Sequence, residues 1–185
     1  MYYCPILSNT LSHEMIHIIH FVTFTKTAIT QRWLRDGSRW RETAGFGSPL
    51  STPQLGKVYI FADRVWPFYV GKASQRLGSR LGGGFRATPE RRIAGFAGYR
   101  FKQHMTNAFL HVFMGPPASP WSSIEAECIE AEVVFRIRQA GAWPKYQTEI
   151  HFAEAKPVHT SAADEIMAYF GTLRKRNGLN PPSGI

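Results

Sequence analysis

The stretch Lys57–Leu81, KVYIFADRVWPFYVGKASQRLGSRL, decides the fold of this 185-residue chain. It contains two short aromatic and β-branched runs, VYIF and FYV, and the connector between them is short enough for a β-hairpin. A hairpin centred on Arg64 predicts that Tyr59 lies opposite Tyr69, so that both phenols share one face of a sheet. The alternating residues then point to the other face, into a core: Val58, Ile60 and Val70.

Glycine and basic side chains follow the second of these strands. Gly71 allows the backbone to pass close beneath the two phenols, because it has no Cβ atom. Lys72, Arg76 and Arg80 follow on a segment that favours a helix. This layout is typical of a phosphate-handling site. The run 82–84, three glycines, predicts a flexible hinge; it lacks the spacing of a nucleotide-binding loop, so no nucleotide cofactor is expected.

A second candidate segment is a helix that carries a carboxylate on an apolar flank. Ser122 and Glu125 form a capping-box pattern, and the helix is expected to run to about Gln139. Apolar residues surround Glu130 at helical spacing. Because burial of an unpaired carboxylate is costly, Glu130 is expected to bind a divalent cation; a salt bridge or a solvated helix edge are the alternatives, and Glu127 is the next candidate.

Together these segments resemble the GIY-YIG nuclease family. Its two signature tripeptides correspond to the runs 57–59 and 69–71, and its arginine corresponds to Arg80. Glu130 falls at the family's glutamate, and the run PKYQ resembles the family's closing motif, with Gln147 in place of an asparagine. Two departures stand out: Lys57 replaces the usual glycine, and Gly84 stands where many members carry a histidine.

The resemblance implies a DNA endonuclease that uses Mg²⁺, with Mn²⁺ as a substitute. Glu130 would hold the metal, Tyr59 would help to deprotonate the attacking water, and Arg80 would stabilise charge on the phosphate. For Tyr59 to act as a base, nearby positive charge must lower its pKa from about 10. Tyr69 and Lys72 would position the phosphate or the metal-bound water. Further residues are expected to contact the substrate: Gly71, Arg76 and Gln147.

The composition favours a polyanionic partner. The net charge is +9, and between Asp63 and Arg100 eight basic residues stand against two acidic ones. Clusters of Lys and Arg gain affinity for DNA by releasing counterions from phosphates, whereas a merely soluble basic surface is the alternative. Interleaved arginines and tryptophans over 31–42 suggest a further DNA contact through Arg35 and Arg39, with core packing as the rival interpretation.

The cysteines and the N-terminal segment bear on the cellular location and on a possible zinc site. Cys4 and Cys128 form neither a disulfide framework nor a metal-spaced pair, which predicts a reducing, cytoplasmic setting, and no run is long enough to span a membrane. The run 13–17, HEMIH, matches a zinc-binding helix pattern, but the residues from Ile16 to Thr25 favour a strand.

The predicted fold class is α+β: a small, mainly antiparallel sheet flanked by helices. The expected divisions are an N-terminal extension over 1–55, a catalytic core over 56–152, and a C-terminal helix and tail over 153–185. A restriction-type enzyme is favoured, because the chain is too short for a second large domain. A structure-specific repair nuclease and a catalytically weak DNA-binding module are the alternatives. The sequence leaves the oligomeric state open, a homodimer included.

Overall fold

A six-stranded antiparallel sheet forms the centre of the protein. The structure, a computed structural model, describes residues 14–88, 97–142, 144–146 and 154–178. The strand order is β3-β2-β1-β6-β4-β5, and every neighbouring pair is antiparallel. This confirms the predicted α+β class. The strands are β1 (Ile16–Phe24), β2 (Ile29–Asp36), β3 (Arg39–Glu42), β4 (Lys57–Ala62), β5 (Pro67–Ala73) and β6 (Asn107–Met114).

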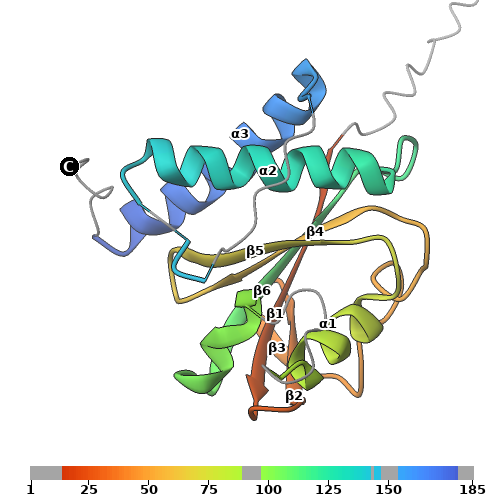
Figure 1. The fold of residues 1–185 in the computed structure, drawn as a ribbon, viewed down its shortest axis with the longest axis vertical. Coiled ribbons are helices and arrows are strands. Elements are labelled where there is room, and N and C mark those ends of the chain that lie inside the picture. Colours follow the sequence, from red (N-terminus) through yellow and green to blue (C-terminus); the bar gives the residue numbers. More distant parts are fainter. Residues whose placement is uncertain (1–13, 89–96, 143, 147–153, 179–185) are drawn as a thin grey trace, which may run out of the picture.

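Helices cover both faces of the sheet and create two cores. The helices are α1 (Leu77–Arg86), the 3₁₀ helix η1 (Ala97–Gln103), α2 (Ser123–Gln139) and α3 (Pro157–Arg176). Figure 1 shows α2 and α3 crossing each other on one side of the sheet, with α1 on the other. The core beneath α1 and η1 contains Tyr59, Tyr69 and Tyr99. The core beneath α2 and α3 contains Val58, Ile60 and Val70, as the alternation predicted.

The N-terminal strands belong to the same sheet as the segment expected to be the catalytic core. Strand β1 lies in the interior of the sheet, between β2 and β6. This strand confirms the strand interpretation of the residues that follow Ile16. The zinc-binding helix pattern is wrong at His17, because His17 lies on the strand and not on a helix. His17 lies on this strand and stacks on Phe113 at 4.1 Å between ring centroids. His13 lies outside the described residues.

The β4–β5 hairpin has a different register from the one predicted. Tyr59 pairs with Gly71, and Phe61 pairs with Tyr69, so the two tyrosines are diagonal neighbours rather than direct partners. The cause is a bulge beside Phe61 together with a tight turn, in which Asp63 Oδ1 accepts hydrogen bonds from two backbone amides, each at 2.8 Å. Both phenols still share a face, with ring centroids 6.0 Å apart.

One helix prediction also needs correction. The capping box of α2 and its end at Gln139 are confirmed. Helix α3 is the expected C-terminal helix, and it starts at Pro157 because proline is favourable in the first helical turn. The three glycines 82–84 are not a hinge but part of α1, whose apolar side is buried at Leu81 and Phe85. The predicted contact Gln147 lies outside the described residues.

Two buried lysines stabilise the loops and helix around the tyrosine-containing core. Lys57 is 0 % exposed, and its Nζ donates to the carbonyls of Thr52 and Leu55, each at 2.8 Å. Lys102 Nζ donates to the carbonyls of Phe85 at 2.6 Å and Ala87 at 2.8 Å, at the C-terminal end of α1. A positive charge there is favourable to the helix dipole. Both lysines therefore support the structure rather than bind a phosphate.

In the described part of the chain no helix is both long and apolar enough to cross a bilayer.

Buried histidines predict that acid destabilises the fold. Burial lowers the pKa of His17 and His20 to about 4 and that of His111 to about 3. The unfolded chain, with histidine pKa values near 6.5, then binds more protons than the folded chain. The free energy of unfolding should fall as the pH drops from about 6.5 towards 4, by up to about 1.4 kcal/mol per pH unit for each histidine.

Urea unfolding at pH 7.5, 6 and 5, followed by tryptophan fluorescence, measures this slope. His111→Leu should flatten it, whereas the same change at the exposed His104 should leave it intact. Equal stability at pH 7.5 and 5 would contradict the expectation.

Candidate active site

The first element of the candidate site is the contact between Tyr59 and Gly71. A Cβ atom added at Gly71 would lie 2.5 Å from Tyr59 Cζ and 2.6 Å from its hydroxyl oxygen. The Tyr59 ring therefore lies directly against the backbone of β5, which only glycine permits. The predicted close approach at Gly71 is confirmed, and the group that lies against Gly71 is the ring of Tyr59.

A third phenol, Tyr99, completes this group and was not found by the sequence analysis. Its hydroxyl lies 3.1 Å from the hydroxyl of Tyr59. A Cβ atom at Gly84 would lie 2.3 Å from Tyr99 Cζ, so the Tyr99 ring occupies the space beside Gly84. The glycine that departs from the family pattern thus accommodates a tyrosine from η1. No local pattern indicates this pairing, because Tyr59 and Tyr99 are 40 residues apart.

Arg80 lies among the three phenols and is half-buried. Its Nε donates to the Lys72 carbonyl at 3.3 Å, which fixes the side chain against the end of β5. Burial alone would lower the pKa of Arg80, but the phenols of the three tyrosines and the carboxylate of Glu130 raise it above its ordinary value. The guanidinium group therefore keeps its positive charge at any physiological pH.

The phenols themselves are held in the protonated form. Burial raises the pKa of Tyr59, and the opposing effect of Arg80 is smaller. Burial likewise raises the pKa of Tyr69 and Tyr99 well above the ordinary value. In the protein chain alone, the positive charge of Arg80 lowers the pKa of Tyr59 by less than burial raises it. Tyr59 is 0 % exposed and Tyr69 is 5 % exposed, so Tyr69 is the phenol nearer to solvent.

Glu130 lies near this group on α2. Helix α2 packs against β4 and the edge strand β5, and the charge of Glu130 contributes to the raised pKa of both Tyr59 and Tyr69. The neighbouring carboxylate, Glu127, forms an ion pair with Lys72. Lys72, predicted to position the phosphate, is therefore bound to a carboxylate one helical turn from Glu130.

Glu130 suits Mg²⁺, which needs few protein ligands, better than it suits a metal ion that is bound by protein side chains alone. In the described residues there is no group of three or more His, Cys, Asp or Glu side chains that could enclose an ion. Mg²⁺ commonly uses one or two carboxylates and completes its six ligands with waters and substrate phosphate oxygens. Glu130, which is half-buried and close enough to Arg80 for its charge to raise the pKa of Arg80, fits that use, whereas a tetrahedral zinc site does not.

The other predicted contacts lie apart from the phenol group. Arg76 is exposed at the N-cap of α1. Arg39 pairs with Asp36 across the β2–β3 hairpin, and Arg35 pairs with Trp40 on the opposite face. Trp33 and Trp40 lie near the ring of Phe21, with ring centroids at 5.7 and 6.4 Å, but Trp33 is only partly buried and Trp40 is exposed. The core interpretation therefore does not hold for Trp40.

Comparison with protein-family models, curated proteins and solved structures finds no match for this chain.

The contact of Gly84 with Tyr99 predicts a position-specific effect of alanine. Gly84→Ala should destabilise the protein by about 1–3 kcal/mol, because the new methyl group overlaps the Tyr99 ring. Gly83→Ala is the matched control: nothing lies within 4 Å of its Cβ position, and alanine is the better helix former by about 1 kcal/mol. Urea unfolding measures both.

A double mutant separates the Tyr99 contact from other effects. Gly84→Ala should cost less in a Tyr99→Leu background than in the wild-type protein. An additive pair would mean that Gly84 is restricted by something other than Tyr99.

Proposed function

We propose that the protein is a metal-dependent DNA endonuclease that hydrolyses phosphodiester bonds. The observation that supports this most strongly is the placing of Arg80, a permanent cation, among three protonated phenols and near the carboxylate of Glu130. Charge stabilisation by fixed donors and cations is the main requirement for phosphoryl transfer. The net charge of +9 supports a polyanionic substrate.

In this proposal each residue has a distinct task. Arg80 stabilises the negative charge that develops on the phosphate, and Tyr69 donates a hydrogen bond to a phosphate oxygen. Glu130 holds Mg²⁺ or Mn²⁺, which when bound acts as a Lewis acid toward the phosphate. The ion pair with Glu127 holds Lys72 at the side of the site.

The task of Tyr59 differs from the one that the family resemblance implies. Tyr59 is fully buried, protonated and bonded to Tyr99. A protonated phenol cannot accept a proton, so in the chain's own electrostatic environment Tyr59 is a positioning residue. It keeps Tyr99 and Tyr69 in place around Arg80.

Within the nucleases, we favour a restriction-type enzyme that cuts duplex DNA at a specific sequence. The supporting observation is that β1, β2 and β3 extend the sheet that carries the phenols, and that β2 and β3 carry arginines. Such a surface lets a small protein contact DNA without a separate domain. A structure-specific repair nuclease is the second candidate, and a catalytically weak DNA-binding module is the third.

Metal dependence and Glu130 provide the first test of the activity. The purified protein should nick or cut plasmid DNA in the presence of Mg²⁺ or Mn²⁺, and cleavage should stop in excess EDTA. Glu130→Gln should lower the cleavage rate on the order of 10²- to 10³-fold while duplex binding persists. Glu132→Gln, the same change on the same helix, is the control, because Glu132 pairs with Arg136 instead.

Cleavage that continues undiminished in EDTA would rule out the metal assignment. A wild-type protein that binds DNA but never cuts it would support the binding-module alternative. Mapping the ends of a digested long plasmid then separates the nucleases: one repeated end sequence indicates a restriction-type enzyme, and cuts confined to flaps or forks indicate repair.

Tyr59→Phe distinguishes a positioning residue from a general base. Loss of one hydroxyl–hydroxyl bond should lower the cleavage rate about fivefold, because one such bond is worth about 1 kcal/mol. Tyr99→Phe removes the same bond from the other side and should have a similar effect. A loss of about 10²- to 10⁴-fold for Tyr59→Phe alone, with a changed pH profile, would instead identify Tyr59 as the base.

A further inference from the structure

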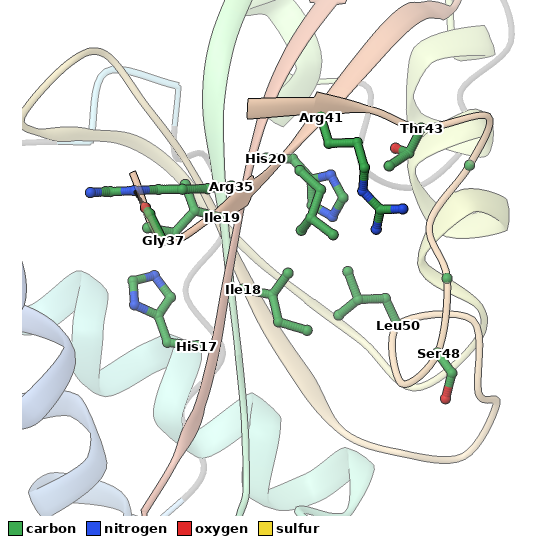
Figure 2. Close-up of a pocket in the computed structure, with 13 residues that line it drawn as sticks. His17, Ile18, Ile19, His20, Arg35, Gly37, Arg41, Thr43, Ser48 and Leu50 are labelled. Atoms are coloured by element: carbon green, nitrogen blue, oxygen red, sulfur yellow. Dashed lines mark hydrogen bonds between the residues drawn. The ribbon is translucent and has the colours of Figure 1, made fainter. Parts of the chain in front are cut away.

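A cavity of about 570 Å³ lies beside the N-terminal strands, apart from the phenol group. Its walls come from β1, the β2–β3 hairpin and the loop 43–50. Figure 2 shows the side chains of His20, Arg41 and Leu50 pointing toward one space, with Arg35 across β1 from them. This volume is within the usual range of pockets that bind small molecules and cofactors.

The cavity opens on the same face of the sheet as the candidate active site. His20 pairs with Leu110, and Leu110 pairs with Phe61, which lies in the core of Tyr59. Residues paired across antiparallel strands share a face. The loop that closes the cavity also touches the helix that carries Arg80, because the Leu77 amide donates to the Leu50 carbonyl at 3.0 Å.

Two side chains that line the cavity have unused hydrogen-bonding capacity. His20 Nδ1 and Thr43 Oγ1 are buried, and neither has a hydrogen-bond partner among the described residues. His20 is 2 % exposed. Most buried polar groups in native proteins are paired, and an unpaired one costs about 1–3 kcal/mol, so such groups call for a partner from outside the chain.

The charge and the walls of the cavity restrict that partner. Arg41 lines it on the face of His20 and Leu34, whereas the side chain of Arg35 lies on the opposite face, and none of its described lining residues is acidic. Ile18, Leu34 and Leu50 supply apolar wall. A suitable ligand therefore combines an anionic group, an apolar or planar body and an edge with hydrogen-bonding atoms. A nucleotide has all three.

We propose that this cavity binds one nucleotide unit, with its phosphate at Arg41 and its base against Leu34 and Leu50. The edge of the base bonds to His20 and Thr43. The assignment of DNA as the source rests on the proposed nuclease function, in which a base turned out of the duplex enters the cavity. A free nucleotide offers the same chemistry and is the other source.

Binding of single nucleotides tests the cavity without any cleavage. Calorimetric titration of Glu130→Gln protein in EDTA uses dAMP, dGMP, dCMP and TMP, with inorganic phosphate for comparison. At least one nucleotide should bind one-to-one and about tenfold more tightly than phosphate. Thr43→Val and Arg41→Gln should each weaken it about tenfold, which corresponds to about 1.4 kcal/mol.

Arg39→Gln is the matched control, because it removes the same charge from the same exposed strand but does not line the cavity. It should leave nucleotide affinity unchanged. The proposal is overturned if no nucleotide binds, if phosphate binds as tightly, or if Arg39→Gln weakens binding as much as Arg41→Gln. Thermal melting of each variant confirms that it is folded.

Competition with DNA identifies the source of the nucleotide. Fluorescence anisotropy measures the binding of a labelled duplex to the same Glu130→Gln protein. If saturating nucleotide and Thr43→Val each weaken duplex binding, the cavity takes a nucleotide from DNA. If the nucleotide binds but neither change affects the duplex, the cavity takes a free nucleotide. Because neither measurement requires cleavage, an inactive wild-type protein would refute the nuclease and not the cavity.

Discussion

The hydrogen bond between the hydroxyls of Tyr59 and Tyr99 joins two tight ring-to-glycine contacts, and the candidate site depends on that connection. Tyr59 lies against Gly71 on β5, and Tyr99 lies against Gly84 on α1. The two contacts together bring the hairpin, α1 and η1 to one point. Arg80 is held near that point by the hydrogen bond from its Nε to the Lys72 carbonyl.

This arrangement also explains why the phenols differ from simple surface tyrosines. A group that excludes water well enough to hold Arg80 in a fixed position also raises the pKa of every phenol in it. Rigid placement and proton acceptance therefore oppose each other in this core. The protein gains an ordered set of hydrogen-bond donors, and any base must come from a group with better access to solvent.

Local patterns predicted the parts of the fold that depend on neighbouring residues. The capping box of α2, the strand alternation in the hairpin and the close approach at Gly71 all follow from short spacings. The register was not predicted, because it depends on the Asp63 turn and on the bulge beside Phe61, and neither is indicated by the residue types that mark the two strands. Tyr99 was missed because its position depends on packing against distant residues.

Buried charges limit what the composition can show. Lys57 and Lys102 both contribute to the net charge of +9, yet both bond to backbone carbonyls inside the protein. The glycine run 82–84 suggested flexibility, but Lys102 caps that helix and Tyr99 packs against it. A count of residue types cannot separate these structural cations from the arginines that remain exposed on β3.

Those exposed arginines have a further consequence for self-association. In the described part of the chain, strand β3 is an edge of the sheet, it has only four residues, and all of them are exposed. Pairing with β3 of a second molecule would bring arginines from both copies together, and short, charged edge strands resist such pairing. Repulsion between these arginines therefore disfavours growth of the sheet from one molecule to the next at β3.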